Sequence, residues 1–444
     1  MRVAIATLGC KVNQYDTATI ETRLRGEGCT MVAFAPGADV YVVNSCTVTD
    51  RADAESRQLA RRARRFNPAA RVIMTGCFAQ VNPRAAAVPE VDHVVGLNRL
   101  PDLLRAVRGE LTAAQRVLAD DLRTARRVQT LGADTFTGQT RAFLKIQEGC
   151  DLFCTFCIVP FSRGRSRSVP PRQVLEQLQR LAARGFQEVV LTGVHLGGYG
   201  LDLQPAMELC DLLEMILEQP PLPRLRLSSI DPPEVTGRLL DLMQRSDVLC
   251  PHLHIPVQAG EDAVLRRMRR TYDTALLRDL SGEIRTRLPH AAVGTDVIAG
   301  FPGESDAQFE ATLALLEELP ITYFHVFPYS RRSGTTAAKL PDHVAPAAIR
   351  RRAARLRQLG ERRRAEFARR FVGAELAVLA EGPPVRSAGR LCGYSRNYQR
   401  VEFPGPPELA NQEVRVRITG AAGVKLRGAL PAAPLYDGEG ARRD

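Results

Sequence analysis

The sequence predicts an α/β protein of three parts: an N-terminal doubly wound parallel sheet (residues 1–130), a central partial (β/α)6 barrel (136–365) and a small C-terminal β-barrel (371–432). Apolar runs of strand length alternate with helical patterns through the first two parts, as in parallel sheets. From Val414 to Ile418 the period changes to strict alternation with arginine, which is typical of a half-buried strand. With 444 residues and 45% apolar residues, the chain can form about three domains.

The first part should form a parallel sheet with helices between its strands. We expect strand Val3 to Thr7, a helix near Thr17 to Gly26, strand Val40 to Val43, helix Ala52 to Phe66 and strand Arg71 to Met74. In such a sheet, ligands gather beyond the carboxyl ends of the strands.

Each of these three strands is followed by a cysteine: Cys10, Cys46 and Cys77. Any one of them, taken singly, is more often an inert core residue. Because equivalent strand ends meet at one edge of a sheet, three such cysteines favour a shared metal site. Three thiolates suggest an iron–sulfur cluster with one free coordination position.

A second set of cysteines, Cys150, Cys154 and Cys157, lies in a short loop after the expected strand Ala142 to Ile146. This loop can place three thiolates around one soft metal centre, but it supplies no fourth ligand. A structural zinc site usually has four protein ligands, and no further Cys or His follows in this stretch. The spacing therefore favours an open metal centre over a zinc knuckle or three incidental thiols.

Six strand-like runs in the central part predict an open, partial barrel rather than a closed eight-stranded one. They are Ala142 to Ile146, Glu188 to Leu191, Leu225 to Ser228, His252 to Val257, Val293 to Ala299 and Ile321 to Phe327. Barrel sites lie at the carboxyl ends of the strands, where Thr192, Gly193, Ser229 and Ile298 are found. Ordinary strand-to-helix turns explain these residues equally well.

Several other residues have simple explanations. His252 and His254 have the spacing of a metal pair, but alternation along a strand explains it. We expect Cys29, Cys210 and Cys250 to be packed core residues.

The C-terminal part offers aromatic and basic side chains suited to unpaired RNA. They are Tyr394, Arg396, Tyr398, Arg400, Lys425 and Arg427. The alternative is that the tyrosines are core residues and that the basic residues form an ordinary solvated surface. Residues 350 to 370 form an arginine-rich helical pattern that suits either solvent or phosphates, and residues 433–444 look disordered.

Composition limits the cellular setting. The net charge of +12 suits an anionic partner such as RNA. Ten cysteines without a signal peptide favour the reducing cytoplasm, and no apolar run is long enough for a membrane span.

The Cys150 loop, with the aromatic Phe156 before its last cysteine, resembles that of the radical S-adenosylmethionine (SAM) enzymes. The segment Thr7 to Asp16 (TLGCKVNQYD) and the later cysteines extend the resemblance over nearly the whole chain, to the radical-SAM methylthiotransferases. The most similar branch acts on threonylcarbamoyladenosine in tRNA. That family normally has leucine and serine where this chain has Val257 and Ala259.

The resemblance implies two [4Fe-4S] clusters, one on Cys10, Cys46 and Cys77 and one on the Cys150 loop within a radical-SAM barrel. It further implies SAM bound near Phe156, Thr192, Gly193, Ser229 and Ile298, and a C-terminal RNA-binding TRAM domain. An electron donor such as flavodoxin or ferredoxin and a sulfur donor would be partners.

The implied function is methylthiolation of C2 of N6-threonylcarbamoyladenosine at position 37, in the tRNA anticodon loop. The threonylcarbamoyl substituent carries a carboxylate, which Arg163 or Arg165 near the clusters could bind. Three alternatives stay open: isopentenyladenosine in tRNA, an aspartate of a ribosomal protein, and a non-enzymatic iron–sulfur RNA-binding redox sensor.

Overall fold

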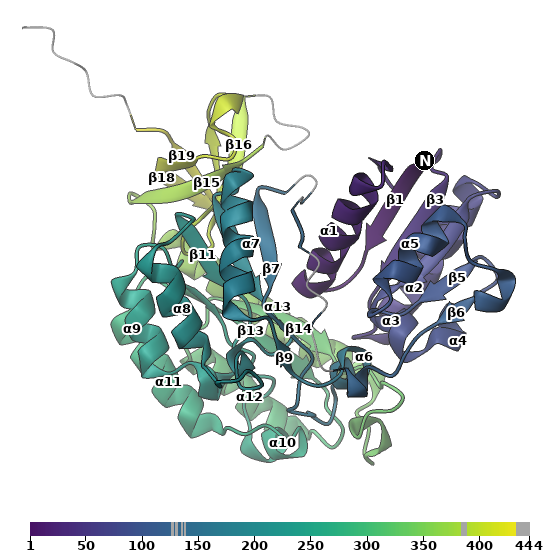
Figure 1. Ribbon diagram of the computed structural model, residues 1–444. Helices are drawn as coiled ribbons and strands as arrows, with labels where there is room; N and C mark the ends of the chain where they lie inside the picture. The colour runs from purple at the N-terminus through teal and green to yellow at the C-terminus, as the bar shows by residue number, and fades with distance from the viewer. Residues whose placement is uncertain (126–127, 129–131, 135, 137–138, 383–388, 432–444) are drawn as a thin grey trace, which may run out of the picture. The chain divides into compact units, whose positions relative to one another are not determined.

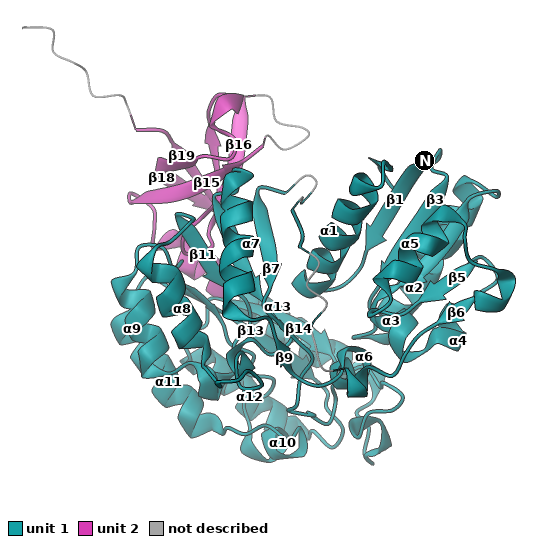
Figure 2. Ribbon diagram, in the orientation of Figure 1, with its two compact units in different colours: residues 1–360 teal, residues 361–444 magenta. Residues whose placement is uncertain are grey.

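The computed structural model describes residues 1–444 except 126–127, 129–131, 135, 137–138, 383–388 and 432–444. The chain divides into two compact units, residues 1–360 and 361–444 (Figure 2). The expected tail at 433–444 lies outside the described residues. None of the described helices is long and apolar enough to cross a membrane.

The N-terminal sheet has six strands, all paired in parallel, in the order β2-β1-β3-β4-β5-β6 (Figure 1). The strands are β1 (Arg2–Thr7), β2 (Thr30–Val32), β3 (Val40–Ser45), β4 (Arg71–Thr75), β5 (His93–Val95) and β6 (Val117–Leu118). The predicted parallel sheet is confirmed. The sequence did not predict β2, β5 and β6, because two or three residues are too few to show a period.

Helices cover both faces of this sheet, which is why its strands read as continuous apolar runs. The helices are α1 (Lys11–Gly26), α2 (Asp50–Phe66), α3 (Gly76–Val81), α4 (Pro83–Ala86) and α5 (Leu100–Arg108). In β3, Val40 and Val42 pack with α1 and α5, whereas Tyr41 and Val43 pack with α2 and α3. The sheet is therefore doubly wound.

The second sheet system is a six-stranded arc. Its strands are β7 (Arg141–Lys145), β10 (Glu188–Thr192), β11 (Arg224–Leu227), β12 (His252–His254), β13 (Ala292–Ala299) and β14 (Tyr323–Pro328). Two parallel three-stranded sheets, β7-β10-β11 and β12-β13-β14, are joined by the bridge pairs Leu225–Leu249 and Ser229–His254. No pairing closes β14 onto β7 within the described strands, so the predicted partial barrel is confirmed.

Helices form the outer layer of the arc (Figure 1). They are α7 (Pro171–Ala183), α8 (Leu209–Glu218), α9 (Gly237–Arg245), α11 (Thr274–Arg287) and α12 (Asp306–Glu318), with the shorter α6 (Val159–Arg163) and α10 (Asp262–Arg267) near the strand ends. Helix α12 begins with a capping box of Ser305 and Gln308. A two-stranded ribbon, β8 (Gln147–Glu148) with β9 (Arg167–Ser168), flanks the Cys150 loop, and the long α13 (Pro346–Arg369) follows β14.

The C-terminal unit is a closed five-stranded barrel in the order β15-β16-β17-β19-β18. Its strands are β15 (Glu375–Glu381), β16 (Arg390–Ser395), β17 (Arg400–Pro404), β18 (Glu413–Ala422) and β19 (Lys425–Ala429). The predicted small β-barrel is confirmed. Its core buries Val378, Leu391, Phe403 and Val416 completely or nearly so.

Glycine is required where the backbone turns into the Cys150 loop. Gly149 has φ +76°, and a Cβ there would lie 2.0 Å from the Arg165 carbonyl oxygen. Gly185 has a similar φ of +87°, but a Cβ there would meet nothing within 4 Å.

We expect Gly149→Ala to lower the free energy of unfolding by roughly 3 kcal/mol, because it combines left-handed strain with a clash against backbone. The matched control Gly185→Ala should cost only about 1 kcal/mol, from strain alone. Urea unfolding followed by circular dichroism measures both. Equal losses in the two variants would show that the Arg165 contact does not constrain the loop.

Candidate functional site

The three N-terminal cysteines meet at the carboxyl edge of the sheet. Cys10 precedes α1, Cys46 follows β3, and Cys77 lies in the first turn of α3 after β4. Burial, together with the adjacent Cys77 and Cys10, raises the pKa of the Cys46 thiol to about 12. The backbone approaches closely here, since a Cβ on Gly9 (φ +99°) would lie 3.0 Å from the Cys46 sulfur.

One buried amide, Asn13, ties the three cysteine turns together. Its Nδ2 donates to the Leu8 carbonyl at 2.7 Å and to the Ser45 carbonyl at 3.0 Å, so it holds the turns that lead to Cys10 and Cys46. Its Oδ1 lies 3.7 Å from the Cys77 sulfur. Asn13 is 1% exposed, so this arrangement is fixed within the protein interior.

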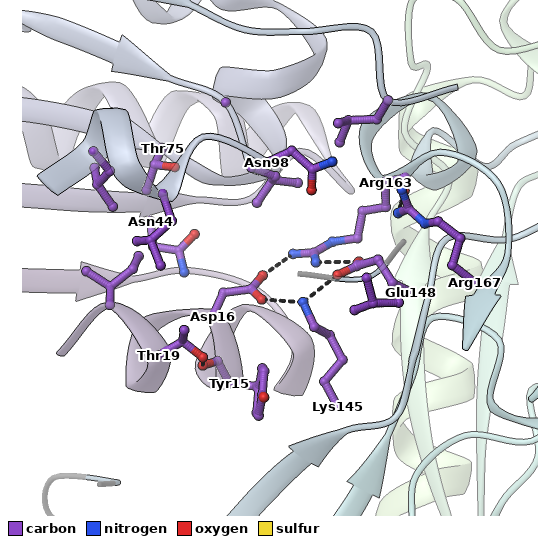
Figure 3. Close-up of a pocket in the computed structure, with 17 residues that line it drawn as sticks. Tyr15, Asp16, Thr19, Asn44, Thr75, Asn98, Lys145, Glu148, Arg163 and Arg167 are labelled. Atoms are coloured by element: carbon purple, nitrogen blue, oxygen red, sulfur yellow. Dashed lines mark hydrogen bonds and ion pairs between the residues drawn. The ribbon is translucent and has the colours of Figure 1, made fainter. Parts of the chain in front are cut away.

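Arg163, from α6 of the barrel region, reaches the same place (Figure 3). Its Nε donates to the Cys77 sulfur at 3.3 Å, and its Nη2 donates to Asn13 Oδ1 at 2.5 Å. The side chain is 2% exposed. A guanidinium from the barrel region therefore contacts a thiol of the N-terminal sheet directly.

Two carboxylates and a second cation complete a buried ionic cluster around Arg163. Arg163 donates to Asp16 at 2.8 Å and to Glu148 at 2.7 Å, and Lys145 donates to Asp16 at 2.7 Å and also pairs with Glu148 (Figure 3). Two cations thus face two carboxylates. Because Glu148 stands two residues before Cys150, the cluster joins the two cysteine sites.

Arg332 provides a second connection between the N-terminal sheet and the segment after β14. Its Nη2 donates to Thr47 Oγ1 at 2.7 Å and to Asp53 at 2.6 Å, and it also pairs with Asp50. Thr47 follows Cys46 in the chain. Arginines from the barrel region therefore hold the Cys46 turn and the Cys77 turn separately.

The second cysteine set has a comparable arrangement. Burial, together with the neighbouring Cys154, raises the pKa of Cys150 and of Cys157 to about 12. Arg270 donates to the Cys154 sulfur at 2.9 Å, pairs with Asp231 and lies over the Tyr272 ring, 4.9 Å from its centroid. Each cysteine set therefore has one buried arginine directed at one of its sulfurs.

These donors fit iron–sulfur clusters. Thiolate sulfur is the ligand such clusters prefer, and the arginines supply positive charge beside it. Each set supplies three thiolates, so a cluster held there would keep one coordination position free of these cysteines. The raised thiol pKa values mean that binding of iron releases protons.

A cavity adjoins Cys157 and brings two of the expected SAM contacts together. Its lining includes Phe156, Cys157, Gln258, Asp296, Ile298, Phe327 and Tyr329. The other three expected contacts do not line this cavity. Thr192 is buried, and a Cβ on Gly193 would lie 2.9 Å from the Gln147 amide oxygen. Ser229 forms a backbone β-bridge with His254. The cavity thus places Phe156 and Ile298 beside the Cys150 loop.

Of the two arginines considered as partners of a substrate carboxylate, Arg163 is already engaged, because its guanidinium contacts Cys77, Asn13, Asp16 and Glu148. Arg165 is exposed and pairs with Asp151 at 3.2 Å.

Sequence analysis did not predict the roles of Asn13, Asp16, Lys145, Glu148 or Arg270. Asn13 and Asp16 lie in the segment Lys11 to Asp16, which the sequence analysis used only for the family resemblance. The structure also groups His254, Asp296 and His325 closely enough to hold a metal ion. In this group Asp296 Oδ1 bonds His254 at 2.9 Å and His325 at 3.1 Å, while His252 bonds the Tyr323 hydroxyl at 2.7 Å.

A parallel sheet with three cysteines at its edge, joined to a partial barrel with a CxxxCxxC loop, defines a radical SAM enzyme with a second cysteine-bearing domain. Family models agree: residues 144–316 match the Radical SAM superfamily, and residues 2–96 match Uncharacterized protein family UPF0004. A solved structure of the radical SAM methyltransferase TsrM from Kitasatospora setae has the same fold, with a TM-score of 0.55 and 18% identity over 76% of this chain and 73% of that one.

Relatives that match over nearly the whole chain identify the family more narrowly than the domain models do. The chain is 39% identical to the threonylcarbamoyladenosine tRNA methylthiotransferase MtaB of Bacillus subtilis (strain 168), over 94% of this chain and 93% of the relative. It is 38% identical to MtaB of Aquifex aeolicus over 94% and 100%, and 34% identical to the tRNA-2-methylthio-N(6)-dimethylallyladenosine synthase of Methylobacillus flagellatus over 97% and 99%. The chain therefore belongs to the tRNA methylthiotransferase family of radical SAM enzymes. The cofactors of this family are SAM and two [4Fe-4S] clusters.

The arginine contacts predict separate effects on the two clusters. Arg163→Met removes a charged N–H···S bond at Cys77, and Arg270→Met removes one at Cys154. Loss of a positive donor disfavours the more negative reduced state, so each variant should lower the midpoint potential of its own cluster by roughly 50–100 mV. Redox titration followed by electron paramagnetic resonance (EPR) measures both potentials.

Arg332→Met is the control, because the hydrogen bonds of the Arg332 guanidinium among the described residues go to Thr47, Asp50 and Asp53 and not to a thiol. Both potentials should stay unchanged in this variant. If Arg163→Met shifted both clusters equally, general loosening of the structure would explain the result and the specific contact would not.

Proposed function

We propose that this chain is the tRNA N6-threonylcarbamoyladenosine (position 37) C2-methylthiotransferase. The observation that carries the proposal is the pair of three-cysteine sites joined through Arg163 and Glu148. Such a pair suits a reaction that needs a radical and a sulfur atom at one carbon. The relatives named for threonylcarbamoyladenosine, at 35–39% identity, support this substrate.

The reaction requires radical chemistry because the C2–H bond of adenine is unactivated. When bound, SAM and the two clusters supply that one-electron chemistry and the sulfur. Cys150, Cys154 and Cys157 would hold one cluster, with Arg270 compensating its charge. Cys10, Cys46 and Cys77 would hold the other, with Arg163 in the same role.

The remaining residues position these groups. Phe156 and Ile298 line the cavity beside Cys157, which suits the adenine of SAM, and Thr192, Gly193 and Ser229 lie at neighbouring strand ends. Asn13 and the Arg163 cluster fix the N-terminal turns relative to the Cys150 loop, so the spacing of the two sites is set before substrate binds.

The C-terminal barrel is suited to hold the tRNA anticodon loop, as a TRAM domain would. Tyr394 and Tyr398 stack with ring centroids 5.0 Å apart, which resembles an aromatic platform for bases. Of the candidate basic residues, Arg396 pairs with Glu413 at 2.6 Å and Lys425 with Glu402 at 3.3 Å, whereas Arg427 forms no ion pair with the described residues. The target base must leave its stack to reach the clusters.

Two further partners follow from the chemistry. An electron donor such as flavodoxin or ferredoxin would reduce the Cys150 cluster, and a sulfur donor would replace the sulfur that is consumed. Both processes suit the reducing cytoplasm, where thiols persist.

Removing each cysteine set separately tests the two-site scheme. After anaerobic reconstitution, Cys150→Ala/Cys154→Ala/Cys157→Ala should keep about half the iron and lose all SAM cleavage. Cys10→Ala/Cys46→Ala/Cys77→Ala should still cleave SAM to 5′-deoxyadenosine but form no methylthio product. A folded variant that lost both clusters would rule out independent sites, and a wild-type protein that never cleaved SAM would favour the redox-sensor alternative.

The substrate assignment predicts a choice between two modified tRNAs offered in parallel. We expect 2-methylthio product on tRNA carrying threonylcarbamoyladenosine and little on tRNA carrying isopentenyladenosine, since a carboxylate-bearing substituent needs polar partners and an isopentenyl group needs an apolar pocket. Nucleoside mass spectrometry reads the outcome. Product on isopentenyladenosine alone would contradict the assignment within the same reaction class, and product on neither would favour the ribosomal-protein substrate.

A further inference from the structure

One polar layer in the lumen of the partial barrel lies next to the cavity beside Cys157. The register of β13 with β14 pairs Ile298 with Phe327 and, two residues earlier, Asp296 with His325. Asp296, Ile298 and Phe327 line that cavity. Because side chains two residues apart share one face of a strand, Asp296 and His325 form a second layer roughly 6–7 Å from the apolar pair.

Neighbouring residues in β14 show that His325 faces the lumen. Phe324 and Val326 pack against the hydrophobic core that includes residues of α12 and α13. Since side chains alternate along a strand, His325 points to the opposite face. The side chain of His325 is 56% exposed and that of Asp296 is 24% exposed, so both are accessible to a ligand in the lumen.

Hydrogen bonds hold these two side chains in place. Asp296 Oδ1 accepts from His254 Nε2 at 2.9 Å and from His325 Nδ1 at 3.1 Å. Although burial alone would raise the pKa of Asp296, these two hydrogen bonds lower it below its ordinary value, so Asp296 is a carboxylate at neutral pH. A carboxylate only accepts hydrogen bonds, and His325 therefore directs its Nδ1–H to Asp296.

Two polar atoms of the layer stay free for a ligand. Neither Asp296 Oδ2 nor His325 Nε2 has a hydrogen bond to the described residues, and neither is buried without a partner. Oδ2 is an acceptor, and Nε2 is a donor when the imidazole is protonated. A ligand with a donor beside an anionic acceptor would satisfy both atoms, whereas a hydrocarbon group would leave both unpaired.

We propose that Asp296 and His325 bind the N6 substituent of the target adenosine and so select a polar, carboxylate-bearing group. This inference rests on the proposed function, in which the substituent is threonylcarbamoyl. Asp296 Oδ2 accepts from an N–H or the hydroxyl of the substituent, and protonated His325 donates from Nε2 to its carboxylate. The reverse placement is disfavoured, because it would set the substrate carboxylate against Asp296. Arg163 cannot take this role, since its partners already surround it.

Paired substitutions separate the bond to Asp296 from the bond to the substrate. The amide nitrogen of asparagine lies near the Nδ1 position of histidine, and that of glutamine lies near the Nε2 position. His325→Asn should weaken binding of an anticodon stem-loop RNA carrying threonylcarbamoyladenosine by roughly 10–100-fold, and His325→Gln by about threefold, because only glutamine keeps the donor that faces the substrate. Fluorescence anisotropy with the reconstituted full-length protein measures the dissociation constants.

His290→Asn is the matched control. His290 is exposed and precedes β13 at the end of the strand opposite to the cavity, so this variant should bind the RNA as wild type does. Circular dichroism and iron content establish that each variant is folded. Equal binding by wild type and folded His325→Asn would overturn the proposal, as would an equal loss in His290→Asn.

A change in the RNA tests the same contact from the other side. In the second RNA, a methyl group replaces the carboxylate of the substituent. Wild type should bind this RNA more weakly by a factor similar to that of His325→Asn, and combining the two changes should cost little more than either one. Losses that simply multiply would show that His325 and the carboxylate do not meet, and equal binding of the two RNAs by wild type would overturn the proposal without any variant.

A metal ion is the competing occupant of this layer, because His254, Asp296 and His325 are close enough to hold one. Metal analysis of the reconstituted protein distinguishes the two cases. We expect no stoichiometric metal other than the cluster iron. One equivalent of zinc in wild type that is lost in His325→Asn would identify a metal site and overturn the proposal.

These results separate failure of the inference from failure of the proposed function. The binding measurements need neither SAM cleavage nor methylthio product. A protein that methylthiolates threonylcarbamoyladenosine but shows independent losses for His325 and the carboxylate would refute the inference alone. A protein with coupled losses that forms product only on isopentenyladenosine would refute the proposed function and leave the binding site intact.

Discussion

The contact between Arg163 and Cys77 is the interaction on which the rest of the site depends. Removing one partner of a buried, hydrogen-bonded charge pair costs about 3–5 kcal/mol, because the other charge stays buried and uncompensated. Arg163 has two carboxylate partners and a thiol, and it comes from the helix that follows the Cys150 loop. The spacing between the two cysteine sites is therefore fixed by a contact that is costly to break.

Both halves of the site use the same property of parallel sheets. Their strands direct their carboxyl ends, and the loops that follow them, to one edge. In the N-terminal sheet that edge carries Cys10, Cys46 and Cys77, and in the barrel the segment after β7 carries Cys150, Cys154 and Cys157. A buried arginine beside each set supplies the positive charge that thiolate-bound clusters need. If each set holds a cluster, the pair would suit the transfer of sulfur to an unactivated carbon.

The sequence was sufficient to predict the main strands, the partial barrel and both cysteine sets, because these depend on local periodicity and on cysteines at strand ends. It was not sufficient to predict the ionic cluster. Asp16 and Arg163 are 147 residues apart, and Asn13 and Arg163 are 150 apart, so no local pattern connects them. For the same reason, the sequence left Arg163 as a candidate to bind the substrate carboxylate, because the partners of Arg163 are known only from the folded chain.

Clusters held by the two cysteine sets would lie close together, because Arg163 contacts Cys77 and also pairs with Glu148, two residues before Cys150. EPR of the reduced, reconstituted protein tests this expectation directly, since neighbouring paramagnetic clusters broaden or split each other's signals. Wild type should show this dipolar interaction, and it should vanish in each triple-cysteine variant, where one cluster remains. A wild-type spectrum equal to the simple sum of the two single-cluster spectra would contradict the account.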